Sequence, residues 1–154
     1  MFKFEEILSV EMCEDNPSFL FVFGDNLLKK GKKGQAIIRD CKNAFGVPTK
    51  RLPSMEKGSF FTDQRDEIDI VKEKLIFLWE EHLSGKTIVL PKNMIGSGLA
   101  RLNENSPYIN GIISRFYNSA KERVHDIEKN EDDSRNNNYS SCTKQSKSLR
   151  TKNR

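Results

Sequence analysis

Two short runs of apolar residues stand out along the chain, and each leads into a glycine-rich segment. Residues 19–23 read Phe-Leu-Phe-Val-Phe, and residues 86–91 read Lys-Thr-Ile-Val-Leu-Pro. Apolar runs without polar alternation are typical of strands that are buried on both faces, in a sheet that helices cover. The pattern therefore predicts two central strands, one over Ser18–Phe23 and one over Lys86–Pro91.

Three further segments have the spacing of helices. Residues 63–83 carry apolar side chains at steps of three and four, with Thr62 or Asp63 as the cap. A second helix is predicted to begin at Ser106-Pro107, because serine favours the cap and proline favours the first turn. A shorter helix is expected from about Gly34 to Asn43.

The remaining segments carry weaker signals. Residues 2–12 alternate weakly and fit either a short edge strand or a helical turn. Residues 44–49 contain β-forming residues interrupted by Gly46 and Pro48, which indicates an edge strand or a short extended segment, because proline cannot donate to a ladder. From residue 128 onward apolar residues become rare, so we expect a domain over 1–127 and a disordered basic tail over 128–154. Strands that alternate with helices predict an α/β fold.

Composition and charge exclude some classes of protein, but they do not identify one. The chain is 36% hydrophobic and 31% charged, and no apolar run approaches the ~20 residues that span a bilayer. We expect a cytoplasmic monomer without membrane contact. The net charge is +4, but residues 128–154 hold seven basic and four acidic groups, so the body is nearly neutral. Three widely spaced cysteines argue against a disulfide framework or a zinc site, and we expect no metal and no cofactor.

Both predicted central strands open into glycine loops. The first strand is followed by Gly24-Asp25-Asn26 and then by Gly31 and Gly34, and the second by Ile95-Gly96-Ser97-Gly98-Leu99. Right-handed crossovers would bring the two loops to the same edge of the sheet. Backbone N–H groups of such loops bind phosphates, so the pair of loops predicts a cradle for a diphosphate. Neither loop matches the dinucleotide fingerprint or the Walker A motif.

Several of these motifs, in this order, resemble an uncharacterised family of phage and bacterial proteins over roughly residues 19–117. They are Phe23-Gly-Asp-Asn-Leu-Leu, Gly31-x-x-Gly-Gln-Ala, Gly46-Val-Pro-Thr-Lys-Arg51, Phe60-Phe-Thr-Asp63 and Ile95-Gly-Ser-Gly-Leu-Ala100. The layout also resembles, more distantly, the macrodomains, and within them the branch of the terminal ADP-ribose glycohydrolases. This second resemblance implies a three-layer sandwich with a mixed central sheet and helices on both faces. It also implies a late glycine loop that wraps the diphosphate and distal ribose of ADP-ribose.

The resembled branch uses a lysine and an aspartate in catalysis. Lys50 stands at the lysine position, whereas Ala100 replaces the aspartate, so that Asp25 or Asp63 would have to supply a carboxylate. Lys50 and Asp25 are therefore the candidate catalytic residues. A nucleophilic lysine needs a lowered pKa, through burial or a neighbouring cation, and Arg51 is adjacent in the chain.

The candidate ligand-binding residues lie in the two loops and on the strand between them. They are Gly24, Asp25, Asn26, Gly31, Gly34, Gln35, Thr49, Lys50, Ile95, Gly96, Ser97, Gly98 and Leu99. Each type also has a purely structural explanation: a glycine can form a tight turn, and Asp25 or Asn26 can form an Asx turn. Ser97 fits a small spacer better than a nucleophile, because no histidine is paired with it.

Two functions remain open from the sequence. The first is binding of ADP-ribose or a related NAD-derived nucleotide, with or without hydrolysis at the distal ribose. The second is a non-enzymatic module that binds nucleic acid or a host partner through the basic tail and the lysines at 29, 30, 32 and 33.

Overall fold

One four-stranded sheet forms the centre of the protein. The computed structural model describes residues 1–148, with side chains described through residue 136. The strands β1 (Phe2–Glu5), β2 (Leu20–Asn26), β3 (Ala44–Lys50) and β4 (Ile88–Pro91) lie in the order β1-β4-β2-β3. Every pairing between them is parallel, so the expectation of a mixed sheet was wrong for these strands. The reason is that a helical segment separates each strand from the next and returns the chain to the same end of the sheet.

The two apolar runs form the inner strands of the sheet, as predicted. β4 is buried along its whole length, and β2 is buried at five of its seven residues. β3 is an edge strand, which explains why Pro48 is tolerated in it. The opposite edge is β1, and a short helix, α1 (Val10–Asp15), follows it with Ser9 as its cap. Both of the structures considered for residues 2–12 are therefore present.

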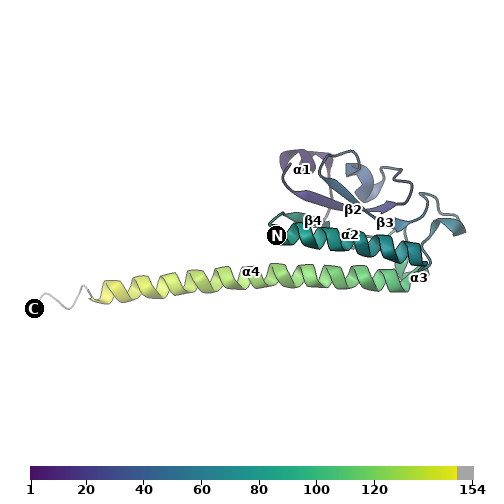
Figure 1. The fold of residues 1–154 in the computed structure, drawn as a ribbon. Coiled ribbons are helices and arrows are strands. Elements are labelled where there is room, and N and C mark those ends of the chain that lie inside the picture. The colour runs from purple at the N-terminus through teal and green to yellow at the C-terminus, as the bar shows by residue number, and fades with distance from the viewer. Residues whose placement is uncertain (149–154) are drawn as a thin grey trace, which may run out of the picture.

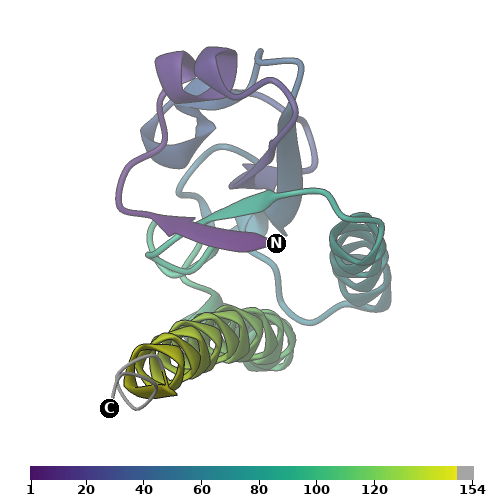
Figure 2. The ribbon, with the colours of Figure 1, turned by 90° about the vertical axis from the view of Figure 1, so that its left-hand side faces the viewer.

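Helices cover the two faces of the sheet and make three layers (Figures 1 and 2). The long helices α2 (Arg65–Leu83) and α4 (Pro107–Ser148) lie on one face, and their apolar side chains form the larger core with those of β1, β2 and β4. On the other face, α1 and the 3-10 helix η1 (Gly34–Ile38) enclose a smaller core against Phe21 and Phe23. The expected α/β fold with helices on both faces is confirmed at this level.

The expected helix from Gly34 to Asn43 was wrong, because only the short 3-10 helix η1 forms there. Its last amide bond runs from Arg39 N to Ala36 O, three residues back, and turns follow. The Asn43 side chain then donates to the carbonyls of Cys13 and Asn16, which fixes the chain as it enters β3. These tertiary bonds prevent a regular helix from continuing.

The start of α2 also differs from the prediction. Gln64, rather than Thr62 or Asp63, is the N-cap, and it forms a capping box with Glu67. Asp63 instead caps the N-terminus of the other long helix, α4. Its carboxylate accepts hydrogen bonds from Tyr108 N at 2.9 Å and Ile109 N at 3.0 Å, the first amides of α4. The predicted start of that helix at Pro107 is confirmed.

The C-terminal helix is longer than expected (Figure 1). α4 runs to Ser148, whereas the sequence led us to expect a disordered tail from residue 128, and residues 149–154 lie outside the described residues. Residues 112–148 contain neither glycine nor proline, so nothing in their sequence interrupts the helix. None of the helices in this part of the chain is both long enough and apolar enough to cross a membrane.

Candidate functional site

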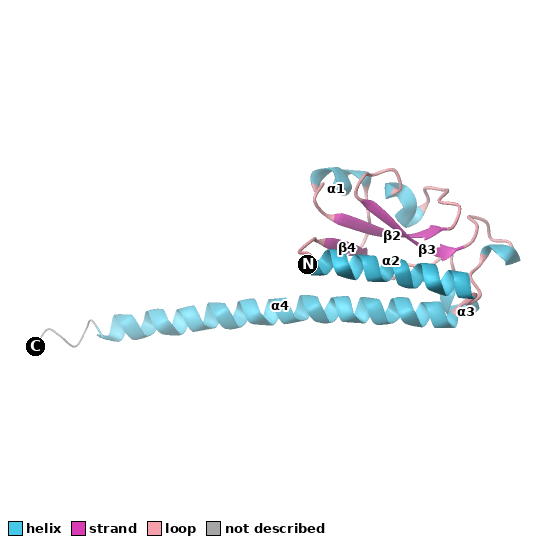
Figure 3. Cartoon of the chain, viewed as in Figure 1, coloured by secondary structure: helices cyan, strands magenta, loops and turns pink. Residues whose placement is uncertain are grey.

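The candidate site lies where the chain leaves β2 and β4 in opposite directions. After β2 the chain passes to η1 on one face of the sheet, and after β4 it passes through α3 (Leu102–Asn105) to α4 on the other face. The loops that follow these neighbouring strands meet at the carboxyl end of the sheet (Figure 3). Ligands of open α/β sheets bind in the crevice at such a reversal of connections.

Gln35 joins the two glycine loops directly. Its Oε1 accepts a hydrogen bond from Gly24 N at 3.1 Å, and its Nε2 donates to Asn93 O at 3.1 Å. A Cβ on Gly24 would lie 3.6 Å from Gly96 N, which shows how closely the two backbones approach. The Gln35 amide thus links the segments that follow β2 and β4. A Cβ on Gly31, Gly34 or Gly98, which the sequence placed in one shared cradle, would meet no atom within 4 Å, so that cradle stays a prediction.

Asp25 makes a buried ion pair rather than facing open space. Arg39 Nη2 lies 2.6 Å from Asp25 Oδ1, and each side chain is about nine-tenths buried, with 12% and 7% exposed. The same Oδ1 accepts a hydrogen bond from Asn26 N at 2.7 Å. The Asp25 carboxylate therefore stabilises the structure through Arg39 and the Asn26 amide, and its catalytic role stays a prediction.

The loop after β2 is held by Asn26 and Arg39. Asn26 Nδ2 donates to Lys30 O at 2.8 Å, which closes a turn across residues 26–30. Arg39 Nε donates to Gly31 O at 2.7 Å, and its Nη2 donates to Lys30 O at 3.2 Å. Gly31 and Gly34 are exposed and have positive φ angles of 93° and 59°, which glycine adopts without strain. The loop is thus fixed to the sheet through the ion pair of Arg39.

Thr49 lies between Asp25 and the late glycine loop. Its Oγ1 donates to Asp25 O at 3.2 Å, and its Cγ2 would lie 3.3 Å from a Cβ on Gly96. That same Cβ would overlap the side chain of Leu102, and Gly96 has a φ of 82°. Only glycine fits at residue 96, so the tight approach is built into the loop.

Lys50 is buried at the end of β3. Its Nζ donates to Ser54 O and lies 4.9 Å from the centre of the Phe60 ring. Burial lowers the pKa of Lys50, and the positive charge of Arg101 lowers it further. The neighbouring cation that the sequence suggested was Arg51, but Arg51 instead forms ion pairs with Asp66 and Glu67 at 2.8 Å. Because side chains alternate along a strand, the cation that affects Lys50 comes from the other loop.

The late loop has an inner and an outer part. Ile95 is buried in the core, and its N–H donates to the Tyr117 hydroxyl at 3.3 Å, while Ser97 Oγ donates back to Met94 O at 2.6 Å. Gly98 and Leu99 are exposed, and within the described residues their N–H groups donate to no protein acceptor. Arg101, at a φ of 48°, ends the turn. The outer part therefore offers backbone donors to a ligand.

Two residues of this site were not found from the sequence. Arg39 lies in a segment expected to be helical, and only the pairing of a buried Asp25 with the nearest arginine could have indicated it. Arg101 directly follows Ala100, and no local motif indicates that its charge acts on Lys50, which lies at the end of β3.

The fold and the loops define the class: a three-layer α/β protein with a parallel sheet and two glycine-containing loops that contact one another at its carboxyl end. Residues 3–116 match the model of a family described as "Family of unknown function (DUF7831)", and the chain belongs to this family. Neither a curated protein nor a solved structure was found to match the chain. The family match fits the expected uncharacterised family, whereas no comparison shows a resemblance to macrodomains.

Proposed function

We propose that the protein binds a nucleotide of the ADP-ribose class at the carboxyl end of the sheet, against the loops that follow β2 and β4. The observation that carries this proposal is the close approach of Gly24 to Gly96, beside the unbonded amides of Gly98 and Leu99. Two loops with exposed N–H groups at the carboxyl end of a parallel sheet suit a diphosphate.

The charges around the late loop support an anionic ligand. Lys50 and Arg101 are close enough for the charge of Arg101 to lower the pKa of Lys50. Neither residue takes part in an ion pair among the described residues. A bound phosphate near both cations would relieve their repulsion, which favours binding of a polyanion over binding of a neutral sugar.

Binding without turnover is the form of this function that the residues favour. Ala100 replaces the aspartate of the resembled glycohydrolases. Of the two carboxylates considered in its place, Asp25 is paired with Arg39, and Asp63 accepts the first amides of α4. Hydrolysis at the distal ribose would need one of these carboxylates to exchange its present partners.

Isothermal titration calorimetry with ADP-ribose tests the proposal. We expect one-to-one binding that Gly98→Trp abolishes, because a Cβ on Gly98 meets no atom within 4 Å, so the bulky side chain would cover the exposed amides of the loop without disturbing the core. Glu11→Trp is the matched control, since Glu11 is equally exposed but lies on α1. Arg101→Ala should weaken binding roughly tenfold, the loss of one charge-assisted contact. No heat at millimolar ADP-ribose, or unchanged binding by Gly98→Trp, would contradict the proposal.

Nucleic-acid binding is the second candidate, and one observation favours it. Lys29, Lys30 and Lys33 are exposed on the loop after β2 and form no ion pair among the described residues, whereas Lys32 pairs with Asp40. If this loop binds a nucleic-acid backbone, retention should fall steeply with salt. Replacing Lys29, Lys30 and Lys33 with glutamate would then abolish retention, and unchanged retention would exclude the loop.

A further inference from the structure

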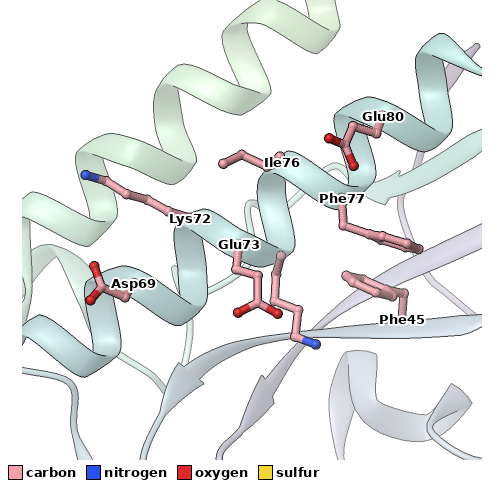
Figure 4. Close-up of a pocket in the computed structure, with 8 residues that line it drawn as sticks. Phe45, Asp69, Lys72, Glu73, Ile76, Phe77 and Glu80 are labelled. Carbon is pink, nitrogen blue, oxygen red and sulfur yellow. The ribbon is translucent and has the colours of Figure 1, made fainter.

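The outer side of α2 carries an exposed row of three residues, each one turn after the last. Lys72, Ile76 and Glu80 are spaced four apart, so they form a single ridge along the helix. Figure 4 shows the three residues following one another along α2. Ile76 is 58% exposed, which is high for a branched apolar side chain in the middle of a helix.

A hollow lies on each side of this ridge. One, of about 590 Å³, lies toward β3, where Phe77 stacks on Phe45 with ring centres 5.0 Å apart. The other, of about 500 Å³, lies between α2 and α4 and has a mainly apolar lining. That lining comes from Leu75, Trp79, Ile112 and Phe116, with the three ridge residues forming part of both hollows. A ridge between two grooves is the surface that one helix presents when it packs against another.

Within the described residues, neither charged side chain of the ridge has an ion-pair partner, and no segment covers Ile76. Glu80 forms no ion pair there, and the nearest described partner of the Lys72 ammonium is the Tyr108 ring, 5.6 Å away. Leu83, one turn beyond Glu80, is 64% exposed on the same helix. Exposed apolar side chains that border an apolar hollow and are flanked by charges are typical of a surface that contacts another molecule.

We propose that this face binds a second copy of the chain, with the two α2 helices crossing at Ile76 and running in opposite directions. Lys72 precedes Ile76 by four residues, and Glu80 follows it by four. A two-fold axis through Ile76 therefore places Lys72 of each copy opposite Glu80 of the other. The ridges of the two copies then lie against one another across the axis, with Ile76 facing Ile76, and the apolar hollow between α2 and α4 of each copy borders the contact.

The symmetry of the charges favours a second copy over an unrelated partner. A surface that binds itself about a two-fold axis must be self-complementary, so opposite charges must lie equally far from the axis. Lys72 and Glu80 meet this condition about Ile76, which is the one apolar residue of the ridge. From the sequence we expected a monomer, and the proposal replaces that expectation.

Sedimentation velocity of the full-length protein tests the contact by exchange of charges. The wild-type protein should dimerise reversibly as its concentration rises. Lys72→Glu and Glu80→Lys should each weaken dimerisation at least tenfold, because like charges then face one another in both contacts. An equimolar mixture of the two variants should dimerise again, since every introduced charge then faces its opposite in the mixed dimer.

The controls separate this contact from unrelated effects. Lys42→Glu changes the same charge on an exposed lysine away from α2 and should leave dimerisation unchanged. Ile76→Ser should weaken dimerisation without altering the charges, and circular dichroism should show unchanged helix content for every variant. Three results would each overturn the proposal: a monomeric wild-type protein at about 1 mM, single variants that dimerise normally, or a mixture that stays monomeric.

Discussion

Gly46 lies directly against the carboxylate of Asp25, so closely that a Cβ at residue 46 would come within 2.5 Å of Asp25 Oδ2. The two residues lie on adjacent strands, two register positions apart, since Asp25 pairs with Pro48 and Gly46 with Phe23. Asp25 cannot simply move away, because Arg39 holds its other oxygen at 2.6 Å. The glycine in β3 is therefore required by a carboxylate in β2.

Replacing Gly46 with alanine should destabilise the protein by about 1–3 kcal/mol, the usual cost of forcing an extra methyl into a packed site. Urea unfolding measures the change. Gly58→Ala is the matched control, because a Cβ there meets nothing within 4 Å and should change stability by less than about 0.5 kcal/mol. Equal stability of the two variants would show that Asp25 can give way.

The ion pair between Arg39 and Asp25 should contribute to both stability and loop order. Arg39→Met leaves a buried carboxylate without its partner, which costs roughly 3 kcal/mol when a buried pair is broken. It also removes the bonds from the guanidinium to Lys30 O and Gly31 O. Hydrogen exchange at residues 27–33 should then accelerate, while exchange in α2 follows only the global loss of stability.

The variant Arg39→Lys separates the effect of the positive charge of Arg39 from the effect of its guanidinium geometry. The lysine keeps the positive charge but lacks the planar fork that reaches two carbonyls and one carboxylate. We expect faster hydrogen exchange in the loop with a smaller loss of stability than in Arg39→Met. If Arg39→Lys behaves as the wild type, the fork is not needed to hold the loop.

The cap at Asp63 links the start of α4 to the segment before α2. Burial alone would raise the pKa of Asp63, but hydrogen bonds from Ser106 and from the amides of Tyr108 and Ile109 outweigh it and lower the pKa. Asp63→Ala should cost about 1–2 kcal/mol, both through the lost cap and because Asp63 has a φ of 59°, which alanine adopts poorly. Asp63→Asn should cost less, since asparagine tolerates this φ and keeps one acceptor.

Because Asp63 titrates, the cap should make the stability of the protein depend on pH in the acid range. The folded-state pKa of Asp63 is depressed, so its contribution is complete above the ordinary value of 3.8 and disappears as pH falls through the lower folded value. Asp63→Asn should therefore lose less stability than the wild type below pH 4, as thermal unfolding at stepped pH would show. Parallel pH profiles for the two proteins would contradict this account.

The sequence predicted those features whose signal is local. The apolar runs of β2 and β4 and the period of α2 were sufficient to place these segments. The crossover argument predicted that the loops after β2 and β4 would share one edge of the sheet, but it did not single out Gly24 and Gly96, the residues that come close. The contacts that determine the chemistry of the site are not local. Asp63 caps a helix that begins 44 residues later, and no pattern around Asp63 distinguishes that use from a cap on α2.

In the polar C-terminal segment, the composition and the helix pattern favour different structures. Its composition predicted disorder, because it has too few apolar residues to pack against the body. The structure continues the helix because residues 112–148 lack glycine and proline, and side-chain pairs such as Glu131 with Arg135 lie along it. Composition indicates whether a segment can join a core, but it does not show whether a helix that begins inside the core will continue outward.

His82 should make the stability of the fold depend on pH in the near-neutral range. Its ring stacks on Phe2 with centres 4.1 Å apart, and its buried Nδ1 has no hydrogen-bond partner among the described residues. Burial lowers the pKa of His82, and the N-terminal amine and Arg123 lower it further by charge repulsion. Below the ordinary value of 6.5 the unfolded chain therefore binds a proton that the folded chain resists, so stability falls as pH decreases from that value.

His82→Phe isolates this effect. Phenylalanine keeps the stack on Phe2 and removes the titrating nitrogen, so the variant should lose less stability than the wild type between pH 6.5 and pH 5, above the range where Asp63 contributes. The N-terminal amine lies near the ring and also has a lowered pKa, owing to burial, but its ordinary value of 8.0 places its effect at higher pH. Urea unfolding at half-unit steps of pH separates the two groups. A wild-type profile that is flat between pH 6.5 and pH 5 would mean that water reaches Nδ1 and stabilises the charged ring.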